Sequence, residues 1–206
     1  MVKVKICGIT NLEDALAALF SGADAIGFVF YGKSPRYITP KKARNISLIL
    51  PKRTLRVGVF ADGNQKSIKK IAKDCGLNIL QFHGNESPGF CQEFKNFKVI
   101  KAFKVDRNIN RKEILKYKTF AYLFDTFSHQ KKGGTGKSFD WKLLKGIDKI
   151  GRPIFLSGGL NNKNIKQAIK TVRPDWVDVS SSVEAKPGKK SHKKVIEFIR
   201  AVKGKK

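Results

Sequence analysis

The sequence has no long apolar run, and this absence argues against a membrane-spanning helix. No stretch approaches the roughly 18 consecutive apolar residues that cross a bilayer. The opening residues, MVKVKICGIT, also lack the apolar core of a secretory leader, and their pattern is typical of a β-strand. We therefore expect no secretory leader and no membrane association.

Cysteine is scarce as well. The three cysteines, Cys7, Cys75 and Cys91, are odd in number and show no CxxC spacing. This pattern argues against a disulfide framework and a zinc site, so we expect no bound metal and a reducing, cytoplasmic environment. Cys75 and Cys91 fall on expected helices and are typical of small buried hydrophobic residues.

Acidic residues are few: 16 Asp and Glu stand against 43 Lys and Arg, which gives a formal net charge of +27. Such an excess raises the possibility of nucleic-acid binding. The basic residues are spread along the chain, however, and neither a helix-turn-helix signature nor an RNP-type motif is present. We expect a lysine-rich surface, no nucleic-acid partner, and a positive field that attracts a small anionic substrate.

Short β-branched or aromatic runs alternate with longer amphipathic segments along the 206 residues. Eight alternating strand–helix units of this length predict a single-domain α/β protein over residues 1–206, a (β/α)8 TIM barrel. The expected strands are Val2–Ile6, Ala25–Phe30, Leu55–Phe60, Asn78–Phe82, Lys98–Phe103, Ala121–Phe124, Pro153–Leu156 and Trp176–Val179. The expected helices are Leu12–Ser21, Lys41–Leu50, Lys66–Cys75, Gly89–Phe94, Arg111–Tyr117, Asp140–Lys145, Asn162–Thr171 and His192–Lys203.

In such a barrel the active site lies at the C-terminal ends of the strands. Cys7 follows the first expected strand, and a thiol with a reference pKa of about 8.5 suits a general base or a nucleophile. Asp125 follows four apolar residues at the end of the sixth strand, where a general acid could stand; a residue that only caps the following loop is the alternative. These two residues are the candidate catalytic pair.

Two loops have the composition of a phosphate site. The seventh strand leads into Gly158 and Gly159, and the eighth leads through Asp178 into Ser180 and Ser181. Loops after these two strands often bind phosphate in barrels, because glycine lets the backbone approach closely and free N–H groups favour an anion. The alternative for the glycine pair is a tight turn without a ligand.

Two further polar residues follow strands. Arg36 is suited to hold a carboxylate, and His83 could hydrogen-bond a substrate, although surface roles are the alternative for both. The segment 133–138, GGTGKS, is similar to a nucleotide-binding P-loop, but that motif requires glycine where this chain has Lys131. We therefore expect no ATP or GTP binding, and a loop that folds over the substrate fits the segment better.

Eight groups of residues along the chain form a recognisable series. They are 5–10, KICGIT; 24–30, DAIGFVF; 34–37, SPRY; 81–84, QFHG; 124–126, FDT; 133–141, GGTGKSFDW; 157–160, SGGL; and 177–181, VDVSS, with 183–184, VE. Through these segments the sequence resembles the phosphoribosylanthranilate isomerase family over nearly its whole length. The resemblance implies a small-molecule substrate carrying a phosphate and a carboxylate, and an Amadori rearrangement in tryptophan biosynthesis without a metal or organic cofactor. Family members occur as monomers and homodimers.

The resemblance also implies roles for the candidate residues. Asp125 corresponds to the general acid and Cys7 to the general base, Arg36 would hold the substrate carboxylate, and the two loops would hold the phosphate. The rival family is the related aminoaldose isomerase of the histidine branch, which uses aspartate where this chain has Cys7. One departure stands out: the family usually has glycine at the position of Ser182, which predicts strain if that position needs a positive φ.

Overall fold

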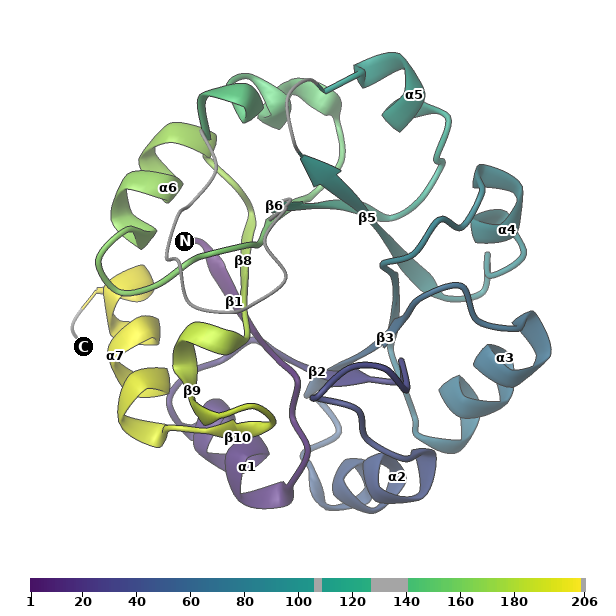
Figure 1. Ribbon diagram of the computed structural model, residues 1–206, viewed down its shortest axis with the longest axis vertical. Coiled ribbons are helices and arrows are strands. Elements are labelled where there is room, and N and C mark those ends of the chain that lie inside the picture. Colours follow the sequence, from purple (N-terminus) through teal and green to yellow (C-terminus); the bar gives the residue numbers. More distant parts are fainter. Residues whose placement is uncertain (106–108, 127–140, 205–206) are drawn as a thin grey trace.

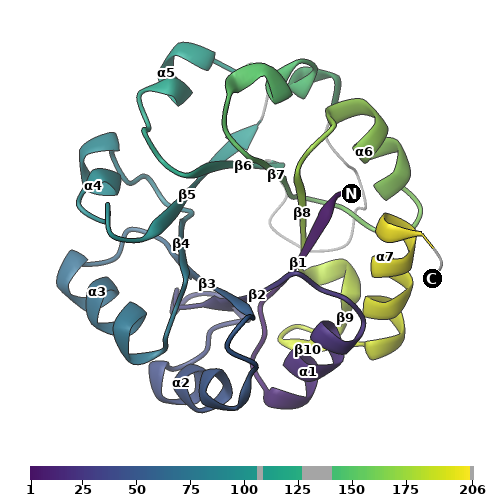
Figure 2. The ribbon, with the colours of Figure 1, turned by 180° about the vertical axis from the view of Figure 1, so that it is seen from behind.

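The computed structural model describes residues 1–105, 109–126 and 141–204. Eight parallel strands close into a barrel in the order β1 to β8, with β8 pairing back onto β1, and the helices form a ring outside it (Figures 1 and 2). The (β/α)8 prediction is confirmed, and every strand boundary lies within two residues of its expected position. The strands are β1 Lys3–Cys7, β2 Ala25–Val29, β3 Leu55–Phe60, β4 Ile79–Phe82, β5 Lys98–Val105, β6 Ala121–Thr126, β7 Ile154–Leu156 and β8 Trp176–Val179.

Seven of the eight expected helices are α-helices. They are α1 Leu12–Phe20, α2 Pro40–Ile49, α3 Gln65–Asp74, α4 Pro88–Gln92, α5 Arg111–Leu115, α6 Ile165–Val172 and α7 His192–Lys203. The expected helix Asp140–Lys145 is wrong in type. The described part of this segment forms a short 3-10 helix, η1 Trp141–Leu144, followed by a second, η2 Ile147–Ile150. Gly146 lies between them with φ of 78°, a left-handed conformation that stops a continuous α-helix.

Alternation along each strand separates two environments. On β1, Val4 and Ile6 pack outward into the apolar layer beneath the helices. Residues two apart share a face of a strand, so Lys3, Lys5 and Cys7 face the barrel interior. Cys7 packs there in a small interior cluster with Val29 and Val59. The barrel interior therefore carries polar and reactive side chains toward the C-terminal ends of its strands.

The segment between β8 and α7 contains structure that was not expected from the sequence. After β8 the chain forms a 3-10 turn, η3 Ser181–Val183, and then an antiparallel hairpin of β9, Glu184–Lys186, and β10, Lys189–Lys190. The hairpin lies beside α1 (Figure 1), where Lys189 Nζ pairs with Glu13 at 2.8 Å. The Lys190 N–H donates to Asp14 at 2.7 Å. These contacts fix the hairpin next to the start of the barrel sheet.

No helix within the described residues is both long enough and apolar enough to span a bilayer.

Candidate active site

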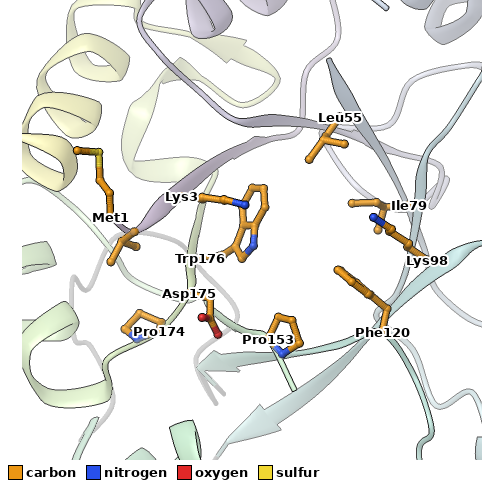
Figure 3. A pocket seen from close by; sticks show the side chains of 11 residues that line it. Met1, Lys3, Leu55, Ile79, Lys98, Phe120, Pro153, Pro174, Asp175 and Trp176 are labelled. Atoms are coloured by element: carbon orange, nitrogen blue, oxygen red, sulfur yellow. The ribbon is translucent and has the colours of Figure 1, made fainter. Parts of the chain in front are cut away.

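Two hollows lie at opposite ends of the barrel. The larger, of about 480 Å³, is at the N-terminal ends of the strands and is mostly apolar (Figure 3). Lys3 lies over the ring of Trp176 on its rim, 5.2 Å from the ring centroid. Five of the lining residues are the first residues of their strands: Lys3, Leu55, Ile79, Lys98 and Trp176.

The smaller hollow, of about 150 Å³, is at the C-terminal ends of β6, β7 and β8. Barrel enzymes place their chemistry at this end. We therefore take the smaller hollow as the candidate active site, in preference to the larger one, because polar groups suited to chemistry converge on it. Its lining comprises Asp125, Ser157, Gly158, Gly159, Leu160, Asp178, Val179, Ser180, Ser181 and Ser182.

The loop after β7 is shaped by its two glycines. Gly158 and Gly159 have φ of 83° and 64°, in the left-handed region that favours glycine. The side chain of Asn164 donates to the Gly159 carbonyl at 2.8 Å and holds the loop in place. Among the described residues, the backbone N–H groups of Gly158, Gly159 and Ser180 have no hydrogen-bond acceptor. Unpaired N–H groups around one hollow form a site suited to an anion.

The loop after β8 contains the departure at Ser182. Strain was expected at Ser182 only if this position needed a positive φ. Ser182 does not have a positive φ, so no such strain arises. Its hydroxyl instead donates to the Leu160 carbonyl at 2.5 Å. Because Leu160 follows Gly159, this hydrogen bond joins the two candidate phosphate loops directly.

Cys7 is the last residue of β1, and its side chain is buried. Burial raises the pKa of the Cys7 thiol above its ordinary value, while the positive charges of Lys5 and Lys190 oppose that shift. The Ser180 hydroxyl donates to the Cys7 carbonyl at 3.1 Å, which ties the end of β1 to the loop after β8. The buried thiol at the barrel mouth is therefore under the influence of two positive charges.

Asp178 is paired inside the barrel. Its Oδ2 accepts a hydrogen bond from Lys5 Nζ at 2.8 Å, and both side chains are almost fully buried. Burial raises the pKa of the Asp178 carboxyl, and the Lys5 ammonium opposes the rise. The other oxygen, Oδ1, is buried and has no hydrogen-bond partner among the described residues. Because Asp178 lines the hollow, that oxygen can accept a hydrogen bond from a ligand.

Asp125 and His83 lie next to each other. His83 Nε2 is 3.1 Å from Asp125 Oδ2, and each side chain is about one-quarter exposed, at 26% and 27%. On its other side, His83 Nδ1 is 3.0 Å from the amide nitrogen of Gln81. An amide N–H that donates to Nδ1 leaves the ring proton on Nε2, facing the carboxylate.

Arg36 is held by a carboxylate of this chain. Its Nε and Nη2 donate to the two carboxylate oxygens of Glu184, at 2.9 and 2.7 Å. Lys190 Nζ also donates to Glu184, at 3.0 Å. Burial opposes ionisation of Glu184, but its bonds to Arg36 and Lys190 hold the pKa of the carboxyl below its ordinary value. Among the described residues Arg36 Nη1 has no acceptor, so it is available to a ligand.

Gly8 allows this cluster to form. A Cβ atom at Gly8 would lie 2.8 Å from Arg36 Cδ and 3.0 Å from Ser180 Oγ, closer than side chains tolerate. The φ of Gly8 is 77°, which also favours glycine. The turn after β1 therefore lets Arg36 and Ser180 approach the strand that carries Cys7.

The structure thus brings the predicted site residues into one region. Reasoning from the sequence gave no individual role to four side chains there: Lys5, Gln81, Glu184 and Lys190. A signal existed for Lys5, since it shares a strand face with Cys7 two residues later. Glu184 and Lys190 gave no signal, because their place depends on the unexpected hairpin. The expected substrate-covering loop, with segment 133–138, lies outside the described residues.

These features define the class of protein. A closed (β/α)8 barrel with a thiol, a carboxyl group and an anion-suited pair of loops at one mouth is the architecture of a barrel enzyme for a small phosphorylated substrate. The family model "N-(5'phosphoribosyl)anthranilate (PRA) isomerase" matches residues 4–201. The chain therefore belongs to this family, and it is an aldose–ketose isomerase of tryptophan biosynthesis.

Individual relatives agree. The chain is similar to N-(5'-phosphoribosyl)anthranilate isomerase of Thermotoga neapolitana, with 50% identity, covering 99% of this chain and 100% of the relative. Two solved structures match over 100% of both chains. Monomers generated from the dimeric isomerase of Thermotoga maritima give 45% identity and a TM-score of 0.87. A family structure in complex with reduced 1-(o-carboxyphenylamino)-1-deoxyribulose 5-phosphate gives 46% identity and a TM-score of 0.88.

Proposed function

We propose that Asp125 and Cys7 are the general acid and general base of this isomerisation. In the first step the Asp125 carboxyl group gives its proton to the ribose ring oxygen, and the bond between C1 and that oxygen breaks. The lone pair of the anilino nitrogen then forms a C1=N iminium ion. Asp125 suits this step because it lines the hollow and because His83, with Nε2 3.1 Å from Asp125 Oδ2, holds its carboxyl group in place.

In the second step Cys7, as thiolate, removes the proton from C2. The electrons of the C–H bond form a C1=C2 double bond and neutralise the iminium nitrogen, which gives an enolamine that tautomerises to the ketone. Burial disfavours the thiolate, and the lysines beside Cys7 offset part of that cost. The substrate's own amine acts as the electron sink, so the reaction needs no metal or organic cofactor.

The remaining predicted residues bind and orient the substrate in this proposal. The unpaired N–H groups of the Gly158–Gly159 loop and of the Ser180–Ser181 loop hold the phosphate. Arg36 holds the anthranilate carboxylate through Nη1, the nitrogen that Glu184 does not occupy. Asp178 accepts a hydrogen bond from a substrate hydroxyl at Oδ1.

His83 has a supporting part. In this proposal it contacts the edge of the substrate, and its hydrogen bond fixes the orientation of the Asp125 carboxyl group. The Gln81 amide behind it restricts the ring to one orientation. The pair therefore presents the acid to the ring oxygen in a defined geometry.

The observation that carries this proposal is the position of Cys7 and Asp125 at the C-terminal mouth, on strands β1 and β6 of one barrel. The fluorescence of the anthranilate substrate reports its consumption directly. Cys7→Ala and Asp125→Asn should each lower kcat by at least about 100-fold, because each removes one proton transfer. Circular dichroism of both variants should match that of the wild type. Turnover near the wild-type rate in either variant would contradict its assigned role.

We also propose that the chain acts as one domain in the cytoplasm and assembles as a homodimer, one of the two states expected from the sequence. Support comes from the relative described as dimeric and from the exposed, mostly apolar hollow at the N-terminal face, a surface suited to a second copy (Figure 3). Light scattering tests the assembly. We propose no nucleic-acid partner, and submicromolar binding to random duplex DNA at physiological salt would contradict this.

A further inference from the structure

Lys5 is a buried cation to which the proposed mechanism assigns no step. Its side chain is fully buried and faces the barrel interior from β1, and its ammonium pairs with Asp178 at 2.8 Å. Across the closing seam of the barrel, Lys5 and Asp178 are also direct register partners of β1 and β8. A charge taken this far from water is expensive, and replacement of such a pair by apolar residues often costs nothing. Stability alone therefore does not account for its presence.

Lys5 is also close to Cys7, the proposed base. The two residues share the inner face of β1, and the positive charge of Lys5 favours the ionised form of the Cys7 sulfur. Gly27 on β2 makes room for both side chains. A Cβ atom there would lie 2.8 Å from Cys7 Sγ and 3.1 Å from Lys5 Cε. The Lys5 side chain is thus close to the Cys7 sulfur while its ammonium pairs with Asp178.

We propose that Lys5 is a positioning residue that stabilises the Cys7 thiolate by its charge, and that a substrate hydroxyl bound to Asp178 strengthens this effect. The inference rests on the proposed roles of Cys7 and Asp178. Its physical basis is competition between two hydrogen bonds to Asp178. When Oδ1 accepts a hydrogen bond from a substrate hydroxyl, the carboxylate holds the Lys5 ammonium at Oδ2 less strongly. Substrate binding then favours the thiolate at the moment when a base is required.

The charges around Cys7 predict the direction in which each substitution moves the pKa of its thiol. Lys5 lowers the pKa of the Cys7 thiol and Asp178 raises it, each against a larger increase caused by burial. Lys190, on the hairpin, also lowers it and stays in place in the variants below. Removal of Lys5 and removal of the Asp178 charge should therefore move the titration of Cys7 in opposite directions.

The test is a pH titration of the Cys7 thiol in the free enzyme. The rate of alkylation by iodoacetamide and the ultraviolet absorbance of the thiolate report its ionisation, and a Cys7→Ser protein provides the background of Cys75 and Cys91. Lys5→Met should move the ionisation to higher pH than in the wild type. Asp178→Asn should move it to lower pH. Because no turnover is measured, this result is independent of whether the proposed acid–base roles are correct.

Two further variants serve as controls, one for misfolding and one for effects that follow from the loss of any buried lysine. The double variant Lys5→Met/Asp178→Asn removes both buried charges together, so it leaves neither unpaired, and its Cys7 ionisation should still lie above that of the wild type. Lys101→Met is the matched control, because Lys101 forms another buried ion pair, with Glu86 at 2.8 Å, in the layer outside the barrel wall. It should leave the Cys7 titration unchanged. An unchanged Cys7 titration in the folded double variant, or a shift as large in Lys101→Met, would overturn the proposal.

Discussion

Replacement of Arg36 by methionine should raise KM for the isomerisation and leave kcat nearly unchanged. Glu184 occupies two of the guanidinium nitrogens, so the structure leaves one, Nη1, for the substrate carboxylate. A single hydrogen bond between charged groups contributes about 1.5–3 kcal/mol. Since about 1.4 kcal/mol corresponds to a factor of ten, KM should rise roughly 10- to 150-fold. Arg36 touches no reacting carbon in the proposed mechanism, so kcat should stay within about threefold.

The assay is steady-state consumption of the fluorescent substrate at fixed ionic strength. The matched control is Lys33→Met, because Lys33 is an exposed cation in the same loop, and its loss changes the overall field by the same single charge. The control should keep KM within about twofold. A variant Arg36→Met with normal KM and a greatly reduced kcat would refute the reasoning, because it would place Arg36 in the chemical step.

Two predictions concern the other contacts of the mouth. Ser182→Gly should raise KM about 2- to 12-fold at constant kcat, because it removes the hydrogen bond between the phosphate loops. Ser182→Ala separates loss of the hydroxyl from added backbone freedom. An unchanged KM in both variants would contradict a role for this hydrogen bond in binding. Glu184→Gln should lower the free energy of unfolding by about 3–5 kcal/mol in urea at neutral pH, since it leaves the buried Lys190 without its counter-charge. Because the folded-state pKa of Glu184 is depressed, its stabilisation is present above the unfolded carboxyl pKa of about 4.3 and is lost as pH falls through the folded value. The variant should therefore lose less stability in acid than the wild type, and an equal loss would count against the ion pair.

The barrel could be predicted from the sequence because its signals are local. Each strand is a short apolar run and each helix carries an amphipathic pattern, so boundaries on β3 and β8 agree to the residue. The predicted position of Cys7 at the mouth followed from the same pattern, since the C-terminal end of a strand is known once the strand is known. Local periodicity thus predicted both the fold and the position of Cys7 at the mouth of the barrel.

What the sequence could not show depends on contacts between distant residues. Lys5 and Asp178 are 173 positions apart, and their pairing requires the register of the closed sheet. The hairpin of β9 and β10 consists of three- and two-residue strands, too short for any periodicity, yet it supplies Glu184 and Lys190 to the cluster around Arg36. The orientation of the Arg36 side chain and the charges around Cys7 can therefore be seen only in the folded structure.

The seam between β1 and β8 bears on the order of folding during synthesis. Lys5 and Cys7 are made at the beginning of the chain, whereas Asp178 and Ser180 are made near its end. A nascent chain that lacks β8 can pair β1 with β2, but Lys5 then has no counter-charge and cannot be buried cheaply. The proposed base would be surrounded by its partners only after the final strand joins the sheet. A truncated product would on this account carry an exposed Cys7 without these partners, and isomerase activity would require β8 in place.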